Sequence, residues 1–253
     1  MNKIVAKEYF SEKVVKFVVE APLIAKARKA GHFVIVRVGE KGERIPLTIA
    51  AADVKAGTIT LVVQAVGKSS SKLCALNPGD YITDVVGPLG RATHIEKFGT
   101  VVCCGGGVGC APLLPIVAAM KEAGNRVITV LAARTKELII LEKQMREYSD
   151  EVIIMTDDGS YGNKGLVTQG VEAVINREKV DLCVTIGPAV MMKFVSLLTR
   201  KYDIPTVASL NTIMVDGTGM CGACRITVGG KTRFVCIDCL LYTSPSPRDV
   251  EES

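Results

Sequence analysis

Two patterns of apolar and polar residues follow one another along this chain. Residues 1–97 carry short Val-, Ile- and Thr-rich runs separated by Gly-Asp and Pro-Gly turn signals, namely KVVKFVVEA, GHFVIVRVG, PLTIAAAD, GTITLVVQAVG and GDYITDVVGPLG. Such closely spaced runs predict a small antiparallel β-barrel. In residues 98–205, apolar strands alternate with amphipathic helices, beginning with TVVCCGGG and PLLPIVAAMKEAG. This alternation predicts an α/β domain with a parallel, doubly wound sheet.

Two further segments follow the α/β pattern. Residues 206–238 are rich in Cys and Gly, and they are too few to fold by themselves without a metal or another cross-link. Residues 239–253, CLLYTSPSPRDVEES, are rich in Ser and Pro, lack periodicity and resemble a translated sequencing-adapter tail. We therefore expect a cluster-binding segment at 206–238 and a non-native tail without function at 239–253.

Composition narrows the classes of function. The 31 basic and 26 acidic residues give a net charge of +5, and the basic residues are scattered, which does not indicate a nucleic-acid partner. The uncharged stretch from Val101 to Met120 contains a glycine triplet and two prolines, so it predicts a strand, a turn and a helix rather than a membrane span. Because the N-terminus lacks a signal-peptide pattern and the nine cysteines are clustered, we expect a cytoplasmic, metal-binding protein.

A glycine-rich loop joins the first apolar strand of the α/β region to a helix. Glycines in such a loop let the backbone approach a pyrophosphate, and the helix N-terminus offers unpaired N–H groups. The loop could equally be a structural turn, because short glycine motifs are common. Its candidate nucleotide-binding residues are Gly105, Gly106, Gly107, Val108, Gly109 and Pro112.

The most specific motif is a set of three cysteines and an aspartate. Asp216, Cys221, Cys224 and Cys236 follow the spacing D-x4-C-x2-C…C, which matches the plant-type 2Fe–2S spacing with Asp in place of the first Cys. A zinc ribbon formed by the three cysteines and Cys239 is the rival interpretation, but its central gap is shorter than the usual ~15–20 residues. The other five cysteines lie in apolar runs and are expected to be buried small hydrophobes.

Three stretches together resemble a known family: SLNTIMVDGTGMCGACRITVGGKTRFVCID, AARTKELIILEKQM and TDDGSYGNKG. They are similar to the small subunits of NADH-dependent reduced ferredoxin:NADP oxidoreductase and sulfide dehydrogenase, and more distantly to the electron-transfer subunit of dihydroorotate dehydrogenase. The resemblance implies a ferredoxin-reductase-like fold, with FAD in the barrel, NAD(H) or NADP(H) on the α/β domain and a 2Fe–2S cluster at the C-terminal segment. Electrons would pass to a large iron–sulfur flavoprotein subunit in a heterodimer.

The resemblance also suggests an activity and leaves alternatives. A large subunit with a second flavin and 4Fe–4S clusters would allow flavin-based electron bifurcation, with ferredoxin as an indirect partner. In the dihydroorotate relative the first cluster ligand is Cys, so Asp216 favours the ferredoxin:NADP branch. The alternatives are a dihydroorotate dehydrogenase electron-transfer subunit and, in another class, a non-enzymatic zinc-ribbon adaptor.

The resemblance assigns flavin-binding roles to the barrel segment RIPLTI. Arg44 would neutralise the pyrophosphate, Pro46 and Leu47 would pack on the isoalloxazine, and the Thr48 hydroxyl would approach N5, where hydride transfer takes place. The common pattern is Arg-x-Tyr-Ser/Thr, so here Arg44 stands one residue further away and Leu47 replaces the aromatic residue. A second segment could bind phosphate or simply cap a helix; its residues are Gly67, Lys68, Ser69 and Ser70.

Candidate nucleotide-specificity residues follow two strands of the α/β region. Asp157 and Asp158 could accept hydrogen bonds from the adenosine ribose or cap the turn at Gly159. Arg134 and Lys136 could instead contact a 2′-phosphate. The sequence therefore predicts an NAD(P)H-dependent flavin oxidoreductase subunit without deciding between NAD and NADP.

Overall fold

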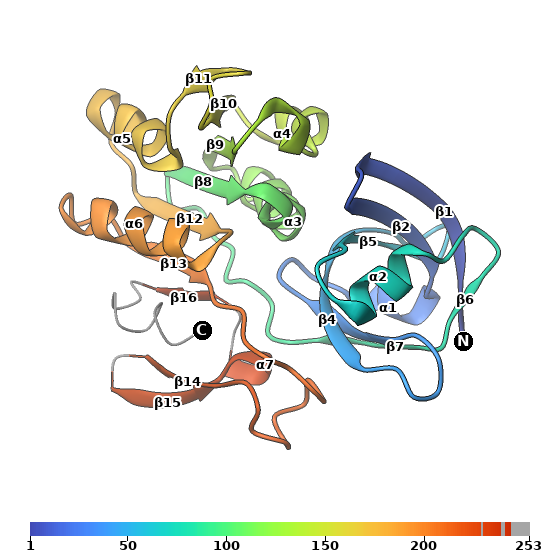
Figure 1. The fold of residues 1–253 in the computed structure, drawn as a ribbon. Coiled ribbons are helices and arrows are strands. Elements are labelled where there is room, and N and C mark those ends of the chain that lie inside the picture. The colour runs from blue at the N-terminus through green and yellow to red at the C-terminus, as the bar shows by residue number, and fades with distance from the viewer. Residues whose placement is uncertain (229, 239–240, 244–253) are drawn as a thin grey trace. The chain divides into compact units, whose positions relative to one another are not determined.

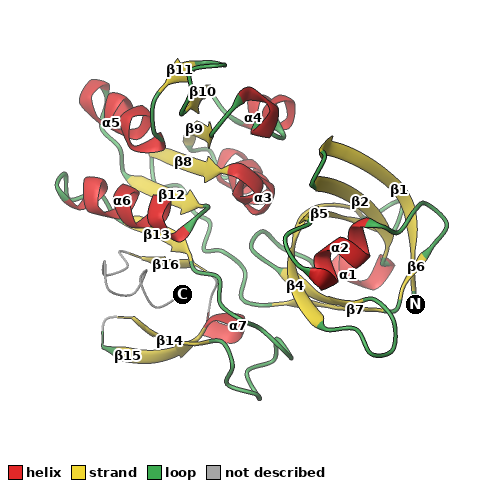
Figure 2. Cartoon of the chain, in the orientation of Figure 1, coloured by secondary structure: helices red, strands yellow, loops and turns green. Residues whose placement is uncertain are grey.

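The computed structural model describes residues 1–228, 230–238 and 241–243, which form two compact units (Figure 1). Of the described residues, the first unit contains 1–93, 212–225 and 234–238, and the second contains 94–211, 226–228, 230–233 and 241–243. The first is mainly a β-barrel and the second an α/β sheet with helices on both faces (Figure 2). The predicted cluster segment, 206–238, is thus divided between the two units.

Seven antiparallel strands build the barrel in the order β6-β1-β2-β5-β4-β3-β7. They are β1 (Asn2–Ser11), β2 (Val14–Glu20), β3 (Phe33–Arg37), β4 (Arg44–Asp53), β5 (Thr58–Gln64), β6 (Tyr81–Ile82) and β7 (Asp84–Leu89). Only Thr83 separates β6 from β7 in the chain, so the two ends of the sheet order meet and the sheet is nearly closed. Two short helices, α1 (Pro22–Ala27) and α2 (Lys68–Cys74), complete this part of the unit.

The barrel core follows from the two-residue period of its strands. Val34 and Val36 of β3 and Ile49 of β4 point inward and belong to one buried cluster, on which Ile45 and Leu47 also pack. Strand β1 is the one barrel strand missing from the apolar runs identified in the sequence. Its residues are mostly charged or exposed around the buried Ile4, so its apolar pattern is weak.

Six parallel strands and one antiparallel strand form the sheet of the second unit, in the order β11-β10-β9-β8-β12-β13-β16. The strands are β8 (Thr100–Gly106), β9 (Arg126–Ala133), β10 (Glu151–Thr156), β11 (Asn163–Lys164), β12 (Leu182–Ile186), β13 (Thr206–Ser209) and β16 (Leu241–Thr243). The helices and 3-10 turns are η1 (Gly107–Gly109), α3 (Cys110–Glu122), η2 (Lys136–Leu138), α4 (Glu142–Tyr148), α5 (Val167–Arg177) and α6 (Ala189–Arg200).

The strand order places a topological switch point between β8 and β12. From β8 the chain proceeds outward through β9 and β10, and it then returns to β12 on the other side of β8. In open α/β sheets, ligands bind at the carboxyl ends of the strands at such a point. The glycine loop begins at the carboxyl end of β8 and therefore lies at this position.

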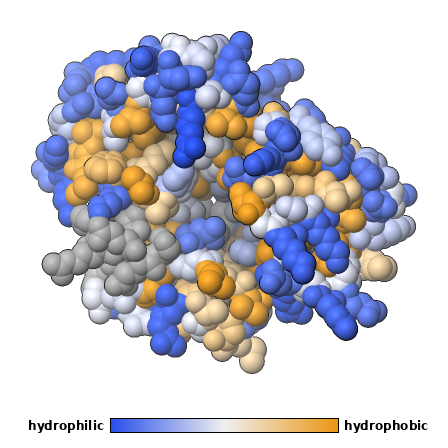
Figure 3. Space-filling model, viewed as in Figure 1, coloured by the Kyte–Doolittle hydropathy of each residue, from blue (hydrophilic) through white to orange (hydrophobic). Residues whose placement is uncertain are grey.

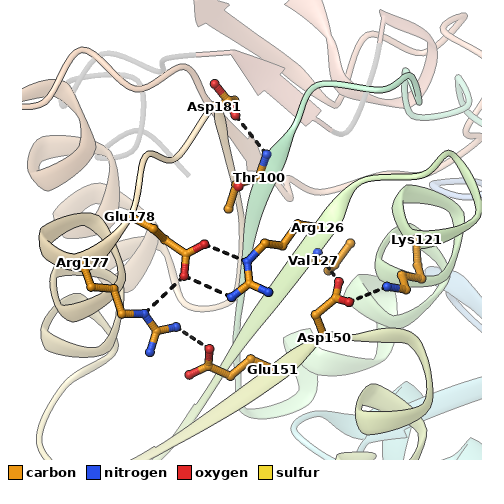
Figure 4. Close-up of polar contacts among 9 residues, drawn as sticks. All are labelled: Thr100, Lys121, Arg126, Val127, Asp150, Glu151, Arg177, Glu178 and Asp181. Carbon is orange, nitrogen blue, oxygen red and sulfur yellow. Dashed lines mark hydrogen bonds and ion pairs between the residues drawn. The ribbon is translucent and has the colours of Figure 1, made fainter.

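A network of ion pairs and hydrogen bonds fixes the opposite, amino edge of the same sheet (Figure 4). Arg126 pairs with Glu178 at 2.7 Å, and Lys121 pairs with Asp150 at 2.6 Å. The residues drawn are Thr100, Lys121, Arg126, Val127, Asp150, Glu151, Arg177, Glu178 and Asp181. These contacts lie at the edge of the sheet opposite the glycine loop.

The C-terminal part of the chain forms a hairpin and a short helix. Strands β14 (Arg225–Val228) and β15 (Lys231–Phe234) make a two-stranded sheet, and α7 (Val235–Asp238) follows directly. Strand β16, within the predicted tail, pairs antiparallel with β13; residues 239–240 and 244–253, Cys239 among them, lie outside the described residues. Among the described helices, none has the length and apolar character that crossing a membrane requires.

Candidate functional site

The loop that precedes β14 brings Asp216 and Cys221 together. The Asp216 carboxylate accepts hydrogen bonds from the backbone N–H groups of Thr218 at 2.7 Å and Cys221 at 2.8 Å, and it also hydrogen-bonds to the Cys221 side chain. The Thr218 N–H is the largest cause that lowers the pKa of Asp216. The carboxylate is therefore held in its anionic form beside an exposed thiol.

The other two cysteines form a second, buried pair. The Cys224 and Cys236 sulfurs lie 3.2 Å apart, and both side chains are buried. The Cys236 backbone N–H donates to the Cys224 sulfur at 3.5 Å, and the Gly219 N–H hydrogen-bonds to the Cys236 sulfur. Burial raises the pKa of Cys236 to about 12. N–H groups directed at sulfur are the contacts that stabilise thiolates bound to iron.

These two pairs fit a binuclear cluster better than a single metal ion. In the described part of the chain, no three His, Cys, Asp or Glu side chains are grouped so that they could hold one ion. A 2Fe–2S cluster requires only two protein ligands for each iron. The Cys224–Cys236 separation is also close to the ~3.8 Å expected for two thiolates on one tetrahedral ion with metal–sulfur bonds of about 2.3 Å. The chain therefore supplies the two ligand pairs that a 2Fe–2S cluster requires.

The loop that precedes β14, residues 212–224, is called the cluster loop below. It lies directly on the outer face of the barrel. Gly217, next to Asp216, has φ +74°, and a Cβ built on it would lie 2.8 Å from Leu89 Cδ1 and 3.0 Å from Ile35 Cγ1. Phe33 and Ile35 are each only 1 % exposed. Because Val34 and Val36 point into the barrel, Phe33 and Ile35 face outward, and the loop packs on this outer face.

The same outer face carries three of the four flavin residues predicted in β4. Strand β4 pairs with β3 so that Thr48 is opposite Phe33 and Pro46 is opposite Ile35, and directly opposed residues of an antiparallel pair share a face. Arg44 is exposed on this face as well. Leu47 instead packs against the barrel core, so a flavin on the outer face would contact Leu47 only through its backbone. The wider spacing from Arg44 to Thr48 keeps both on one face.

Among the described strands, the first half of β4 pairs with only one neighbour. Residues 44–48 of β4 pair with β3, whereas pairing of β4 with β5 begins at Ile49. The Ser69 hydroxyl donates a hydrogen bond to the Glu43 carboxylate at 2.6 Å. This bond joins the start of α2 to the residue before β4. The Ser70 hydroxyl accepts from the Gly67 N–H at 3.0 Å and thus caps α2. The structure brings the two predicted flavin segments together, with Ser70 acting as the helix cap.

Close packing explains three of the four loop glycines at the switch point. A Cβ on Gly105 would lie 3.0 Å from the Cys110 sulfur, one on Gly106 would lie 2.5 Å from the Met191 sulfur, and one on Gly109 would lie 2.6 Å from the Ile186 carbonyl oxygen. Gly107 differs, because its φ is +54° and a Cβ on it would meet nothing within 4 Å. Its backbone is the part of the loop that a ligand can approach.

The rest of the loop continues into α3. Val108 lies in η1 and is half-buried. Pro112 lies in the first turn of α3, where a backbone N–H has no partner within the helix and a proline is tolerated. The N-terminus of this 13-residue helix therefore stands at the carboxyl edge of β8, next to Gly107.

The two predicted nucleotide-specificity segments meet at the carboxyl ends of β9 and β10. The Ser160 backbone N–H and hydroxyl donate to the Asp158 carboxylate at 2.9 and 2.7 Å, and the Lys136 N–H donates to the Ser160 hydroxyl at 2.9 Å. The Ser160 hydroxyl bond is the main reason that the pKa of Asp158 is lowered. Asp158 thus caps the turn, and Asp157 and Arg134 are exposed at this edge.

Phe33, Ile35 and Gly217 were not among the residues singled out from the sequence. The signal for the first two was present, because GHFVIVRVG is a continuous apolar run and not an alternating one. A continuous run of this length indicates a strand buried on both faces. The sequence did not indicate that the cluster loop is the element covering the second face.

Comparison with known proteins places these features in context. Residues 211–238 match the model of the iron–sulfur cluster binding domain of dihydroorotate dehydrogenase B. The chain is 48 % identical over 238 residues to a dihydroorotate dehydrogenase B (NAD(+)) electron transfer subunit homolog of Thermotoga maritima, covering 94 % of this chain and 84 % of that protein. It is 34 % identical over 213 residues to the corresponding subunit of Desulforamulus reducens, covering 83 % and 81 %.

A solved structure covers the whole chain. This structure, described as giving insights into flavin-based electron bifurcation via the NADH-dependent reduced ferredoxin-NADP oxidoreductase, has a TM-score of 0.94 and 44 % identity to this chain. The match covers 100 % of this chain and 92 % of that one. It confirms the predicted order of an antiparallel barrel, a parallel α/β domain and an iron–sulfur segment.

Proposed function

Because this chain belongs to the family of dihydroorotate dehydrogenase B electron transfer subunits and their homologs, we propose that it exchanges a hydride between NAD(H) and a bound FAD and relays single electrons through a 2Fe–2S cluster. Flavin-dependent electron transfer is the chemistry of the family. The observation that carries the proposal is the packing of the cluster loop against the barrel face that bears Thr48. A bound flavin converts a two-electron hydride into single electrons, and a 2Fe–2S cluster carries one electron at a time.

Four side chains would hold the cluster: Asp216, Cys221, Cys224 and Cys236. Cys224 and Cys236 form the buried pair, and Asp216 with Cys221 forms the pair nearer the surface. The N–H groups of Gly219 and Cys236 would stabilise the negative charge on the sulfurs. The division of the chain into residues 1–97, 98–205 and 206–238 remains our proposal for the FAD, nucleotide and cluster regions.

The outer barrel face would hold the flavin. Thr48 would place its hydroxyl near the reacting nitrogen, Pro46 would pack on the ring, and Arg44 would neutralise the pyrophosphate. Lys68 and the backbone N–H groups at the start of α2 would add phosphate contacts beside Ser69.

The nucleotide would bind across the carboxyl edge of the parallel sheet. Gly107 would let its pyrophosphate approach the N-terminus of α3. The adenosine ribose would meet Asp157, because the Asp158 carboxylate already serves the turn. This arrangement supports NAD(H) over NADP(H), with Arg134 as the residue that would bind a 2′-phosphate in the opposite case.

Exposed apolar side chains surround the cluster loop and support a partner subunit at this position. Met220 is 89 % exposed and Ile213 is 77 % exposed, and Val215 and Ile237 are exposed as well. Figure 3 shows apolar atoms gathered over α7 and the loop that precedes β14. Large exposed apolar groups in one place are typical of protein interfaces. The partner would be a large iron–sulfur flavoprotein subunit, as in electron-bifurcating ferredoxin:NADP oxidoreductase, rather than the dihydroorotate-oxidising subunit, because Asp replaces the first Cys ligand.

The state of the cysteines supports a cytoplasmic location. None of the eight cysteines in the described part of the chain forms a disulfide, which is typical of a reducing compartment. Cys103, Cys104, Cys110 and Cys183 are buried and Cys74 is half-buried, in keeping with their interpretation as small hydrophobic residues.

Analysis of anaerobically purified protein tests the proposed function. We expect two irons, two acid-labile sulfides and one FAD per chain, together with reduction of the flavin by NADH. Pull-down with the native chain should recover a large flavoprotein containing several iron–sulfur clusters. A colourless protein that contains zinc would instead establish the zinc-ribbon adaptor.

A further inference from the structure

We propose that Phe33 is a positioning residue that sets the separation between the flavin and the 2Fe–2S cluster. This inference rests on the proposed function, because it concerns the geometry between the two cofactors named there. Phe33 is a buried outward-facing residue of β3. Its backbone pairs with β4, the strand that carries the proposed flavin residues. Its ring lies against the cluster loop at Gly217.

Two glycines hold the Phe33 ring. A Cβ on Gly90 would lie 2.9 Å from both Phe33 Cδ1 and Cε1, and a Cβ on Gly217 would lie 3.4 Å from Phe33 Cε2. Gly90 and Gly217 have φ values of +86° and +74°. At Gly90 a Cβ would collide with the ring itself, whereas at Gly217 a Cβ would meet the ring at ordinary contact distance and would collide with Leu89 and Ile35 beside it.

Leu89 and Ile35 lie beside the Phe33 ring and also contact the cluster loop. Leu89 is the β7 partner of Phe33, and both Leu89 and Ile35 contact the Gly217 position. The loop rests on an apolar surface formed by the side chains of Phe33, Ile35 and Leu89. We call this surface the seat. Gly217 directly follows Asp216, so the height of the loop above this seat sets the position of the first proposed cluster ligand.

Thr48 connects the seat to the flavin. It lies opposite Phe33 in the β3–β4 pair, on the same face, and directly opposed residues have Cα atoms about 4.5–5.5 Å apart. One strand spacing and one phenyl ring therefore separate the flavin-binding strand from the cluster loop. Phe33 spans this interval beside Ile35 and is the larger of the two side chains, so the size of its ring would influence how closely the two cofactors approach.

Substitution of Gly217 by alanine tests the seat with a matched control. Gly217→Ala places a methyl group against Leu89 and Ile35 and should lift the loop. Gly230→Ala is the control, because Gly230 has the same φ of +74° but a Cβ there meets nothing within 4 Å. Both changes place alanine at the same positive φ, and only the Cβ of Gly217→Ala meets Leu89 and Ile35.

The readout is the rate of cluster reduction after NADH reduces the flavin, measured by anaerobic stopped-flow absorbance on the intact holoprotein. Because electron transfer slows as the distance between the two centres grows, we expect Gly217→Ala to slow cluster reduction by roughly severalfold relative to Gly230→Ala. Flavin reduction by NADH should keep its rate in both variants. Equal cluster-reduction rates in Gly217→Ala and Gly230→Ala would overturn the proposal.

A second variant covers the case in which Gly217→Ala loses iron. Phe33→Leu removes the ring and retains an apolar side chain, so FAD and iron contents should stay at the parent level while the cluster-reduction rate and the midpoint potential of the cluster change. A Phe33→Leu protein with full cofactor content and parent values of both quantities contradicts the role of Phe33. Absence of FAD or iron in the parent protein contradicts the proposed function instead.

Discussion

Phe33 and Thr48 are direct cross-strand partners on the outer face of the barrel. The first supports the cluster loop, and the second is the proposed flavin contact. This relationship explains how a loop more than 160 residues further along the chain, at Asp216, comes to lie beside the flavin-binding strand. It also makes the barrel, and not the C-terminal segment alone, the scaffold of the cluster.

Replacing the proposed carboxylate ligand should change the cluster without removing it. Asp216→Cys provides the usual four-thiolate set, so we expect parent iron and sulfide contents and a midpoint potential shifted by roughly tens of millivolts or more. A spectroelectrochemical titration measures the shift. An unchanged titration would count against direct ligation by Asp216.

Substitution in the glycine loop should weaken nucleotide binding. Gly107→Ala and Gly124→Ala both add a methyl group at a positive φ with open space around it, so each should lower the free energy of unfolding by about 1–2 kcal/mol. Only Gly107→Ala should also raise the Kd for NADH, because only Gly107 lies in the loop at the switch point. Isothermal titration calorimetry on both variants makes the comparison, and equal affinities would place the pyrophosphate elsewhere.

The apolar residues around the cluster loop should contribute to subunit association. Met220→Asp puts a charge into the proposed interface, and loss of about 1–2 kcal/mol corresponds to roughly tenfold weaker binding of the large subunit. Val54→Asp is the control, since Val54 is 62 % exposed on the same unit but lies in the β4–β5 turn. Biolayer interferometry with the purified large subunit measures both, and equal loss in the two variants would argue against this interface.

The amino edge of the parallel sheet should make the second unit sensitive to acid. Hydrogen bonds from Lys121 and Arg126 lower the pKa values of Asp150 and Glu178. A carboxyl group whose pKa is lower in the folded state contributes stability that is present above its unfolded pKa of about 4, and this stability is lost as the pH falls through the folded pKa. Thermal unfolding temperatures should therefore fall below about pH 4.

Removing one of these carboxylates isolates its contribution to acid sensitivity. Asp150→Asn should lower the unfolding temperature at pH 7 and flatten its decline on the acid side, because Asp150 accepts from both Lys121 and the Val127 N–H. Asp203→Asn, at an exposed site outside this network, should leave both unchanged. Parallel pH profiles for Asp150→Asn and the parent would contradict the argument.

Much of the fold could be predicted because its signals are local. The apolar runs of the barrel, the alternation of strands and helices and the strand–glycine–helix turn at Gly105 each depend on neighbouring residues. Strand β1 could not be predicted, since its burial comes almost entirely from Ile4 and its remaining residues are largely polar. The order of strands at the switch point likewise depends on packing between distant segments.

The candidate site was predictable in its residue types and less so in its arrangement. The D-x4-C-x2-C…C spacing identified all four proposed ligands, but not that Cys224 and Cys236 form the buried pair. Nor could sequence show that Leu47 points into the barrel while Pro46 and Thr48 point outward, because a strand period of two fixes alternation but not which face is inside. Those assignments depend on long-range contacts.

Electron paramagnetic resonance of the anaerobic, NADH-reduced protein tests the central claim most directly, with Cys224→Ser and Cys74→Ser measured beside the native chain. The account predicts the signal of a reduced 2Fe–2S cluster in the native protein and in Cys74→Ser, whose thiol lies in α2, and its loss or altered g values in Cys224→Ser, where an oxygen would replace a sulfur ligand. A native protein that contains FAD but gives no such signal, or a signal unaffected in Cys224→Ser, would contradict it.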